Sequence, residues 1–144
     1  MRIAAGGPGG YADRGVFSGM QRQTAQRDHI QAVFEGENRP LSPQEVLQKA
    51  RRGAPRLGLA TVYRTIKAFQ EAGWLHAVAI PGQPPRYEWC DASHHHYFHC
   101  NACDQVFKLE GCADNLDSLV PRGFRIEGHE IMLVGKCPRC RRRV

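Results

Sequence analysis

The sequence predicts an α+β chain made of two units, a mainly helical N-terminal unit and a small C-terminal α/β unit with paired cysteines. Three observations lead to this prediction. Amphipathic helical patterns lie between residues 21 and 73, two short β patterns follow them, and two CxxC pairs lie in the last third of the chain. The chain has 144 residues, of which 42% are hydrophobic, so it can bury a core. Units this small commonly need a further stabilising element such as a bound metal ion or disulfides.

Local start and stop signals define the first two helices. Residues 24–36 place apolar side chains on one stripe, and Gly36 ends the pattern. Residues 41–52, LSPQEVLQKARR, begin with Ser42 as the N-cap, a proline at the first helical position, and Glu45 at the capping-box offset. Both segments are therefore predicted to be helices.

A third helix and a hairpin complete the N-terminal unit. Residues 58–75 are amphipathic, and Gly73 closes the helical pattern. The predicted inward face is Val62, Ile66 and Phe69, and the predicted outward face is Tyr63, Arg64 and Lys67. Residues 74–90 read as two short strands joined by a Pro/Gly-rich turn. Three helices followed by a hairpin is the layout of a winged helix-turn-helix, whose last helix fits the major groove of DNA.

Basic residues are concentrated around the second and third helical segments. The net charge is +6, and residues 49–67 contain six basic residues and no acidic residue. Such a stretch suits a polyanion, because each neutralised phosphate releases counterions. Two alternatives to DNA binding remain: the basic residues form a solvated helix face, or the three-helix core binds another protein. Because the acid-free stretch runs into the third helix, we expect a double-stranded DNA partner.

After Ser93 the pattern changes to that of a small α/β unit. HHHYFHC, QVFKL and FRIEGHEIMLVGKC (residues 94–100, 105–109 and 124–137) read as strands. CADNLDSLV (residues 112–120) reads as a short helix.

Paired cysteines are the strongest single signal in the chain. The pairs are Cys100 with Cys103 and Cys137 with Cys140. Four converging thiolates form a closed tetrahedral zinc site that leaves no open position for catalysis. Such a structural zinc could contribute ~10 kcal/mol to a small unit. Buried free thiols and a thioredoxin-like redox pair are the alternatives, and two matched pairs without a preceding βαβ frame favour zinc.

The N-terminal residues indicate the cellular compartment of the protein. Residues 1–20 are rich in glycine and are expected to be a disordered extension, in which Met20 is an alternative start. They lack the apolar stretch of a secretory signal, so we expect a cytoplasmic protein with thiols rather than disulfides. No apolar run approaches the ~20 residues of a membrane span, and no membrane partner is expected.

A histidine cluster precedes the first CxxC pair. In a strand, His94 and His96 point to one side and His95 to the other, so one strand can supply two opposite-facing sites. His76 and Cys90 bracket the hairpin, and a metal held by both would fix its orientation toward the second unit. A mixed His/Cys ligand set suits zinc, whereas iron(II) or manganese takes more carboxylate.

The sequence resembles the ferric uptake regulator family of bacterial metal-responsive repressors from Arg22 onward. The resemblance is carried by GLATVYRTIKAF (58–69), HHHYFHCNAC (94–103), GFRIEGHEIMLVGKC (123–137) and the closing CPRC. It implies a winged-helix DNA-binding domain over 21–91 and an α/β dimerisation and metal-binding domain over 92–144. It also implies a structural zinc in the CxxC pairs and a regulatory metal where the domains meet.

The resemblance also implies roles for individual residues in DNA binding. On the third helix, Thr61, Tyr63 and Arg64 match the positions that contact DNA. Arg22 matches a basic residue that enters the minor groove, and Arg27 matches one near the phosphates.

For the regulatory metal, the resemblance favours the zinc-sensing branch of the family. Its ligand positions match His76, Cys90 and His95. A second family site matches His94, His96 and His129 together with an acidic residue, for which we expect Glu110.

Several family ligands are missing from this chain. Tyr97 replaces a histidine, Lys108 replaces an acidic residue, and residues 38–40 contain no histidine. These losses disfavour the iron- and peroxide-sensing versions of the site and leave the zinc version one ligand short. Glu88, Glu110 or Cys112 could complete a site, although we expect Cys112 to be a buried core thiol.

The sequence therefore predicts a homodimeric, zinc-responsive repressor of metal uptake genes rather than an enzyme. The regulatory ion is expected to be Zn²⁺, with Fe²⁺ or Mn²⁺ as the alternatives, and no small organic substrate is expected. A zinc-dependent hydrolase is the rival from another class, but no HExxH helix is present. A zinc-stapled interaction module that binds no DNA is the third possibility.

Overall fold

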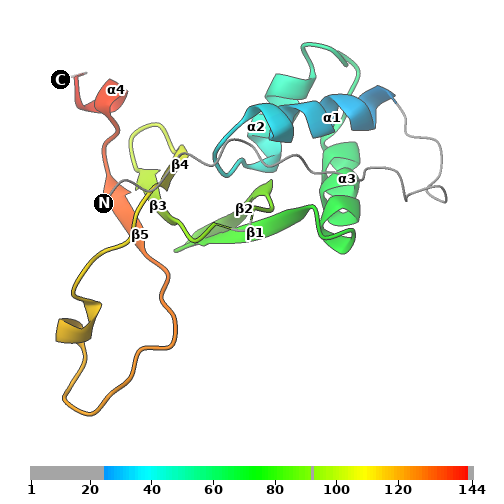
Figure 1. Cartoon of the computed structure of the whole chain (residues 1–144). Helices are drawn as coiled ribbons and strands as arrows, with labels where there is room; N and C mark the ends of the chain where they lie inside the picture. The colour runs from blue at the N-terminus through cyan, green and yellow to red at the C-terminus, as the bar shows by residue number, and fades with distance from the viewer. Residues whose placement is uncertain (1–24, 92, 143–144) are drawn as a thin grey trace, which may run out of the picture.

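The computed structural model describes residues 25–91 and 93–142, so the extension predicted over 1–20 lies outside the described residues. The elements, in chain order, are α1 (Ala25–Gly36), α2 (Pro43–Ala50), α3 (Leu59–Glu71), β1 (Leu75–Ile80), β2 (Gln83–Trp89), β3 (His96–Cys100), β4 (Val106–Leu109), a 3₁₀ turn η1 (Leu116–Leu119), β5 (Met132–Gly135) and α4 (Pro138–Arg141). The three long helices gather at one end of the molecule, and the second sheet and α4 lie at the other (Figure 1). No helix of the described residues is long and apolar enough to cross a membrane.

Local signals place the helix ends where the sequence predicts them. The Ser42 hydroxyl accepts a hydrogen bond from the Glu45 backbone N–H at 3.1 Å, and the Glu45 carboxylate accepts one from the Ser42 N–H at 2.9 Å. The predicted capping box at the start of α2 is therefore confirmed. Gly73 follows the end of α3 with φ +76°, a left-handed conformation that glycine adopts without strain.

One apolar core holds the helices and the hairpin together. It is formed by Ile30, Phe34, Leu41, Val46, Ala50, Ala54, Leu57, Val62, Ile66, Phe69 and Leu75. The predicted inward face of α3 is buried in this core. β1 and β2 pair in antiparallel register, and Leu41 bridges to Tyr87, which ties the chain before α2 to the hairpin.

The second sheet has the strand order β4-β3-β5. β3 pairs antiparallel with β4 and parallel with β5, so a long crossover over residues 110–131 joins the two edge strands. This crossover extends away from the rest of the chain (Figure 1). The strand predicted over 124–137 is confirmed only at Met132–Gly135, and the helix predicted over 112–120 is a 3₁₀ turn of four residues. Both predictions were too long because strands and helices need a packing partner, and Leu119 and Phe124 are exposed.

The two sheets meet at a small second core. Val78 and Ile80 of β1 pack with Val106 of β4, and Tyr97 and Met132 lie against them. β1 therefore lies beside the second sheet, which brings side chains of the hairpin close to the histidines that precede β3.

Candidate metal centres

Three groups of metal-ligating side chains converge in the described residues. Within each group, one ligand atom per residue lies within 4.8 Å of all the others. The tetracysteine group is Cys100, Cys103, Cys137 and Cys140; the hinge group is His76, Glu88 and His95; the loop group is His94, His96, Cys112 and His129.

The tetracysteine group joins the end of β3 to the start of α4. Cys103 Sγ and Cys137 Sγ are 3.9 Å apart, and no disulfide links the four cysteines. The turn after Cys100 closes through a 2.8 Å hydrogen bond from the Asp104 N–H to the Cys100 carbonyl. The structure thus brings the two CxxC pairs together as their spacing predicts, and this tetrathiol set suits a structural zinc ion.

A backbone N–H group in the tetracysteine group stabilises the thiolate form of a cysteine. The Cys137 N–H donates to Cys100 Sγ at 3.3 Å. This hydrogen bond is the largest cause of a lowered pKa at Cys100, outweighing burial, which acts in the opposite direction. Burial and hydrogen bonds with the other thiols raise the pKa of Cys140. One thiol is therefore poised to ionise, and the remaining protons would leave as an ion binds.

The hinge group links the hairpin to the strand that follows it. His76 of β1 lies opposite Glu88 of β2 in the register. The Nε2 atoms of His76 and His95 are each 2.9 Å from Glu88 Oε1. Tyr97 donates its hydroxyl proton to the same oxygen, and its Oη is 2.9 Å from His95 Nε2. Burial, followed by this hydrogen bond to Glu88, raises the pKa of Tyr97.

Glu88 fits the role of a metal ligand. The residue is only 3% exposed, and its Oε2 atom accepts no hydrogen bond from the residues that the structure describes. The Lys108 ammonium lies 3.5 Å from that oxygen, close enough for electrostatic attraction. A buried carboxylate oxygen left without a donor is costly. The His76 and His95 nitrogens converge on the other oxygen, Oε1, so a cation bound there would have two imidazoles and the buried carboxylate as ligands.

Two predicted ligands lie outside these groups. Neither Cys90 nor Glu110 is among the converging ligands of the described residues. Cys90 follows β2, and its N–H donates to the Trp74 carbonyl at 2.8 Å. Glu88, which the sequence offered only as one of three completing ligands, lies with His76 and His95 instead.

The loop group contains the three histidines predicted for the second family site. The Nε2 atoms of His94, His96 and His129 are 3.2–3.3 Å from one another. Cys112 Sγ lies 2.8 Å from His129 Nε2. The expectation of a buried thiol at Cys112 is wrong, since this residue is exposed. Burial, followed by the neighbouring imidazoles, lowers the pKa of His96, so it is neutral and able to ligate near pH 7.

A cavity of about 790 Å³ lies between the hairpin and the second sheet. His76 and His95 of the hinge group line it, as do His94 and His129 of the loop group. Ions can therefore approach both groups from the same cavity.

The predicted DNA-contacting residues lie in the helical unit. Tyr63 is 45% exposed on α3, and the exposed Arg64 donates to Thr61 Oγ1 at 3.1 Å. The Arg27 guanidinium lies 5.1 Å from the centre of the Phe69 ring, so its side chain is half-buried against the core rather than extended into solvent. Arg22 lies outside the described residues.

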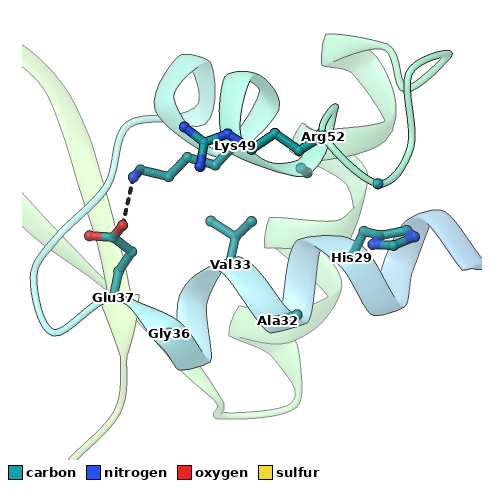
Figure 2. A pocket seen from close by; sticks show the side chains of 9 residues that line it. His29, Ala32, Val33, Gly36, Glu37, Lys49 and Arg52 are labelled. Atoms are coloured by element: carbon teal, nitrogen blue, oxygen red, sulfur yellow. Dashed lines mark ion pairs between the residues drawn. The ribbon is translucent and has the colours of Figure 1, made fainter.

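A separate hollow of about 330 Å³ lies between α1 and α2 (Figure 2). Lys49 and Arg52 supply its positive groups, His29 also lines it, and Glu37 binds Lys49 at 2.6 Å across one side of it. None of the three metal groups contributes to this hollow.

Comparison with known proteins agrees with the fold. The model of the ferric uptake regulator family matches residues 18–134. The ferric uptake regulation protein of Bacillus subtilis is 28% identical over 132 residues, covering 87% of this chain and 89% of the relative. That of Bordetella parapertussis is 30% identical over 107 residues, covering 72% and 77%.

Solved structures of metal uptake regulators also match this fold. The Vibrio cholerae ferric uptake regulator has a TM-score of 0.61 and 26% identity, covering 81% of this chain and 92% of that one. A zinc-bound manganese uptake regulator has a TM-score of 0.69 and 24% identity, covering 81% and 91%, and shares the fold. The fold and the ligand groups define a metal-binding transcription regulator, a class whose members are not enzymes. The chain belongs to the ferric uptake regulator family.

Proposed function

We propose that this chain is a cytoplasmic, homodimeric repressor that binds operator DNA when a regulatory ion occupies the hinge group. Residues 21–91 would form the winged-helix DNA-binding domain, and residues 92–144 the dimerisation domain held by the zinc of the tetracysteine group. The genes it controls would be those of metal uptake, as the family name indicates.

The hinge group carries this proposal. His76 and Glu88 belong to the hairpin, whereas His95 immediately precedes β3 of the second sheet. An ion bound by all three would link the two proposed domains. If this ion binds one domain arrangement more tightly than others, it shifts the population toward that arrangement, and DNA affinity changes with it.

We propose zinc as the regulatory ion. Two imidazoles and one carboxylate form a ligand set that zinc uses in proteins. The presence of Glu88 in place of Cys90 removes the sulfur that favoured zinc at this position. Iron(II) and manganese(II) are therefore the alternatives that the experiment below separates from zinc.

The exposed face of α3 is the proposed reading surface. Tyr63 and Arg64 lie on this face, opposite the buried residues of the same helix. The acid-free stretch of residues 49–67 surrounds it with positive charge, which would attract the phosphate backbone. Thr61 holds the Arg64 side chain by a hydrogen bond and would orient it toward a base edge.

Exposed apolar side chains support the proposed homodimer. Leu133 and Val134 of the edge strand β5 are 50% and 59% exposed, and Leu119 and Phe124 of the crossover are 77% and 69% exposed. An edge strand with apolar side chains tends to associate with another chain. A second copy of this chain would cover these residues.

The test is operator binding at buffered free concentrations of zinc, iron(II) and manganese(II), using a DNA site selected from a random library by the zinc-loaded protein. We expect zinc to strengthen binding at least tenfold, and Glu88→Gln to abolish this response while the tetracysteine group keeps its zinc. Replacing both Tyr63 and Arg64 by alanine should abolish binding at every metal concentration. Equal DNA affinity with and without the regulatory ion would reject the switch, and retained binding by the double variant would reject the reading surface.

A further inference from the structure

Cys112 changes the chemistry of the loop group. Its sulfur completes four protein ligands with the three imidazoles, and all four ligand atoms lie within 4.8 Å of one another. His96 begins β3 and His94 lies just before it, Cys112 follows β4, and His129 precedes β5. Three separate segments therefore converge on one point, and the three histidines are packed with ring centres 4.6–4.9 Å apart.

We propose that Cys112 supplies a sulfur ligand in place of the acidic ligand of the second family site, which makes the loop group a closed three-histidine, one-cysteine site for a zinc-class cation, and that this ion clamps both ends of the crossover onto β3. The proposal goes beyond metal-regulated DNA binding, because it holds whether or not the chain responds to metal through the hinge group.

The donor atoms determine which ions the site takes. Three imidazole nitrogens and one thiolate sulfur suit zinc, cobalt(II) and copper(I), whereas manganese(II) and magnesium prefer oxygen. An acidic residue at position 112 would have given an oxygen ligand, and the resulting ligand set would bind manganese(II) and iron(II) more readily. Four protein ligands also leave no position open for a substrate or catalytic water, as in structural zinc sites.

Clamping follows from the position of the ligands along the chain. Cys112 and His129 are 17 residues apart, near the two ends of the crossover. Between them, the described structure has only the short turn η1, whose ends make local hydrogen bonds such as Ser118 N–H to the Asn115 carbonyl at 3.1 Å. An ion that closes this loop would restrict its conformations. Leu119 and Phe124 would then be held in a defined position for the proposed partner copy.

Cobalt(II) spectroscopy on the full chain tests the sulfur ligand. The metal-free protein first receives one equivalent of zinc, to fill the tetracysteine group, and is then titrated with cobalt(II). We expect a sulfur-to-cobalt charge-transfer band in the wild type, and its loss in Cys112→Ser. Cys90→Ser is the matched control, since Cys90 lies near the hinge group but outside the loop group, and it should keep the band.

Three outcomes would overturn the proposal. These are the absence of a sulfur band in the wild type, an unchanged band in Cys112→Ser, and loss of the band in Cys90→Ser, which would assign the sulfur to the hinge. Cys112→Asp provides a second variant in which the ligand is oxygen. We expect it to lose the band and to bind cobalt more weakly relative to manganese(II) than the wild type does. An unchanged preference would contradict the proposed role of sulfur in selection.

Limited proteolysis tests the clamp. Arg122 and Arg125 are exposed in the crossover and are sites for trypsin. Zinc beyond the first equivalent should slow cleavage there in the wild type and in Cys90→Ser, but not in Cys112→Ser. Circular dichroism and zinc content of the one-equivalent form show whether each variant is folded. Equal cleavage rates with and without the second ion in folded wild-type protein would refute the clamp, even if the cobalt band were present.

Discussion

Replacing Arg86 by methionine should destabilise the chain, because its guanidinium joins three parts of the molecule. Arg86 lies on β2 and is only 5% exposed. It donates to Glu45 of α2 at 3.3 Å, to Gln83 at 3.0 Å, and to Asp104 beside the tetracysteine group at 2.9 Å. Asp104 also accepts from His99 Nε2 at 2.8 Å. Methionine keeps the apolar stem and removes these hydrogen bonds.

The size of the effect follows from the exposure of each partner. Breaking a fully buried ion pair costs about 3–5 kcal/mol, which is the upper bound. The Asp104 side chain is 62% exposed, so water replaces the guanidinium and its share is about 0–1 kcal/mol. Glu45 is 19% exposed and still pairs with Arg39 at 2.9 Å after the substitution. The loss of its bond to Arg86 therefore costs about 1–2 kcal/mol. With a small contribution from Gln83, the free energy of unfolding should fall by about 1–3 kcal/mol.

Urea unfolding of the zinc-loaded chain measures this change. If the free energy of unfolding falls with urea concentration at about 2 kcal/mol per molar, the urea midpoint should fall by roughly 0.5–1.5 M. Arg125→Met is the control, because Arg125 is exposed in the crossover and its replacement should change the free energy by less than about 0.5 kcal/mol. If Arg86→Met and the control behave alike, the guanidinium does not hold α2, the hairpin and the turn after Cys100 together.

Three further predictions concern the tetracysteine group, the dimer and the acid limb of stability. Cys103→Ser should lose the structural zinc and unfold the second sheet, since the ion supplies ~10 kcal/mol; zinc content and circular dichroism check this, and full zinc retention would contradict it. Phe124→Asp should raise the dimer dissociation constant at least tenfold by analytical ultracentrifugation, while an unchanged constant would place the interface elsewhere. Burial alone would raise the pKa of Asp91, but hydrogen bonds, including that from Lys108, outweigh it and lower the pKa to about 2. The stability that Asp91 contributes is therefore present above about pH 4 and lost as the pH falls toward 2. The free energy of unfolding should thus depend less on pH between about 4 and 2 in Asp91→Asn than in the wild type. The same pH dependence in both proteins would refute this.

Features set by neighbours in sequence were predictable. The capping box of α2 joins residues three positions apart, so Ser42 and Glu45 identify it without knowledge of the fold. The turn at Gly73 is likewise a local backbone requirement. The alternation expected of a strand over residues 94–100 put His95 apart from His94 and His96, and the structure places them in different groups, although β3 itself begins at His96.

Features set by strand register and long-range packing were not predictable. Whether Glu88 or Cys90 joins His76 depends on which residue lies opposite it: the two are two positions apart and point to the same side of the chain, so a register shift of two positions would exchange them. The sequence of the hairpin alone does not fix that register. Whether Cys112 is exposed depends on what packs over the crossover, which is set by the assembled structure rather than by neighbours in sequence.

All three ligand groups depend on one short segment, residues 94–100. His95 links it to the hairpin, His94 and His96 link it to the crossover, and Cys100 links it to the end of the chain. Only the hinge group crosses between the two proposed domains, whereas the other two lie within residues 94–140. An ion lost from the hinge would therefore free the DNA-binding domain while the tetracysteine and loop groups still hold the second sheet. In the proposed regulator, the ion that would report on metal supply is separate from the ions that would maintain the fold, so the chain would lose its signal without unfolding.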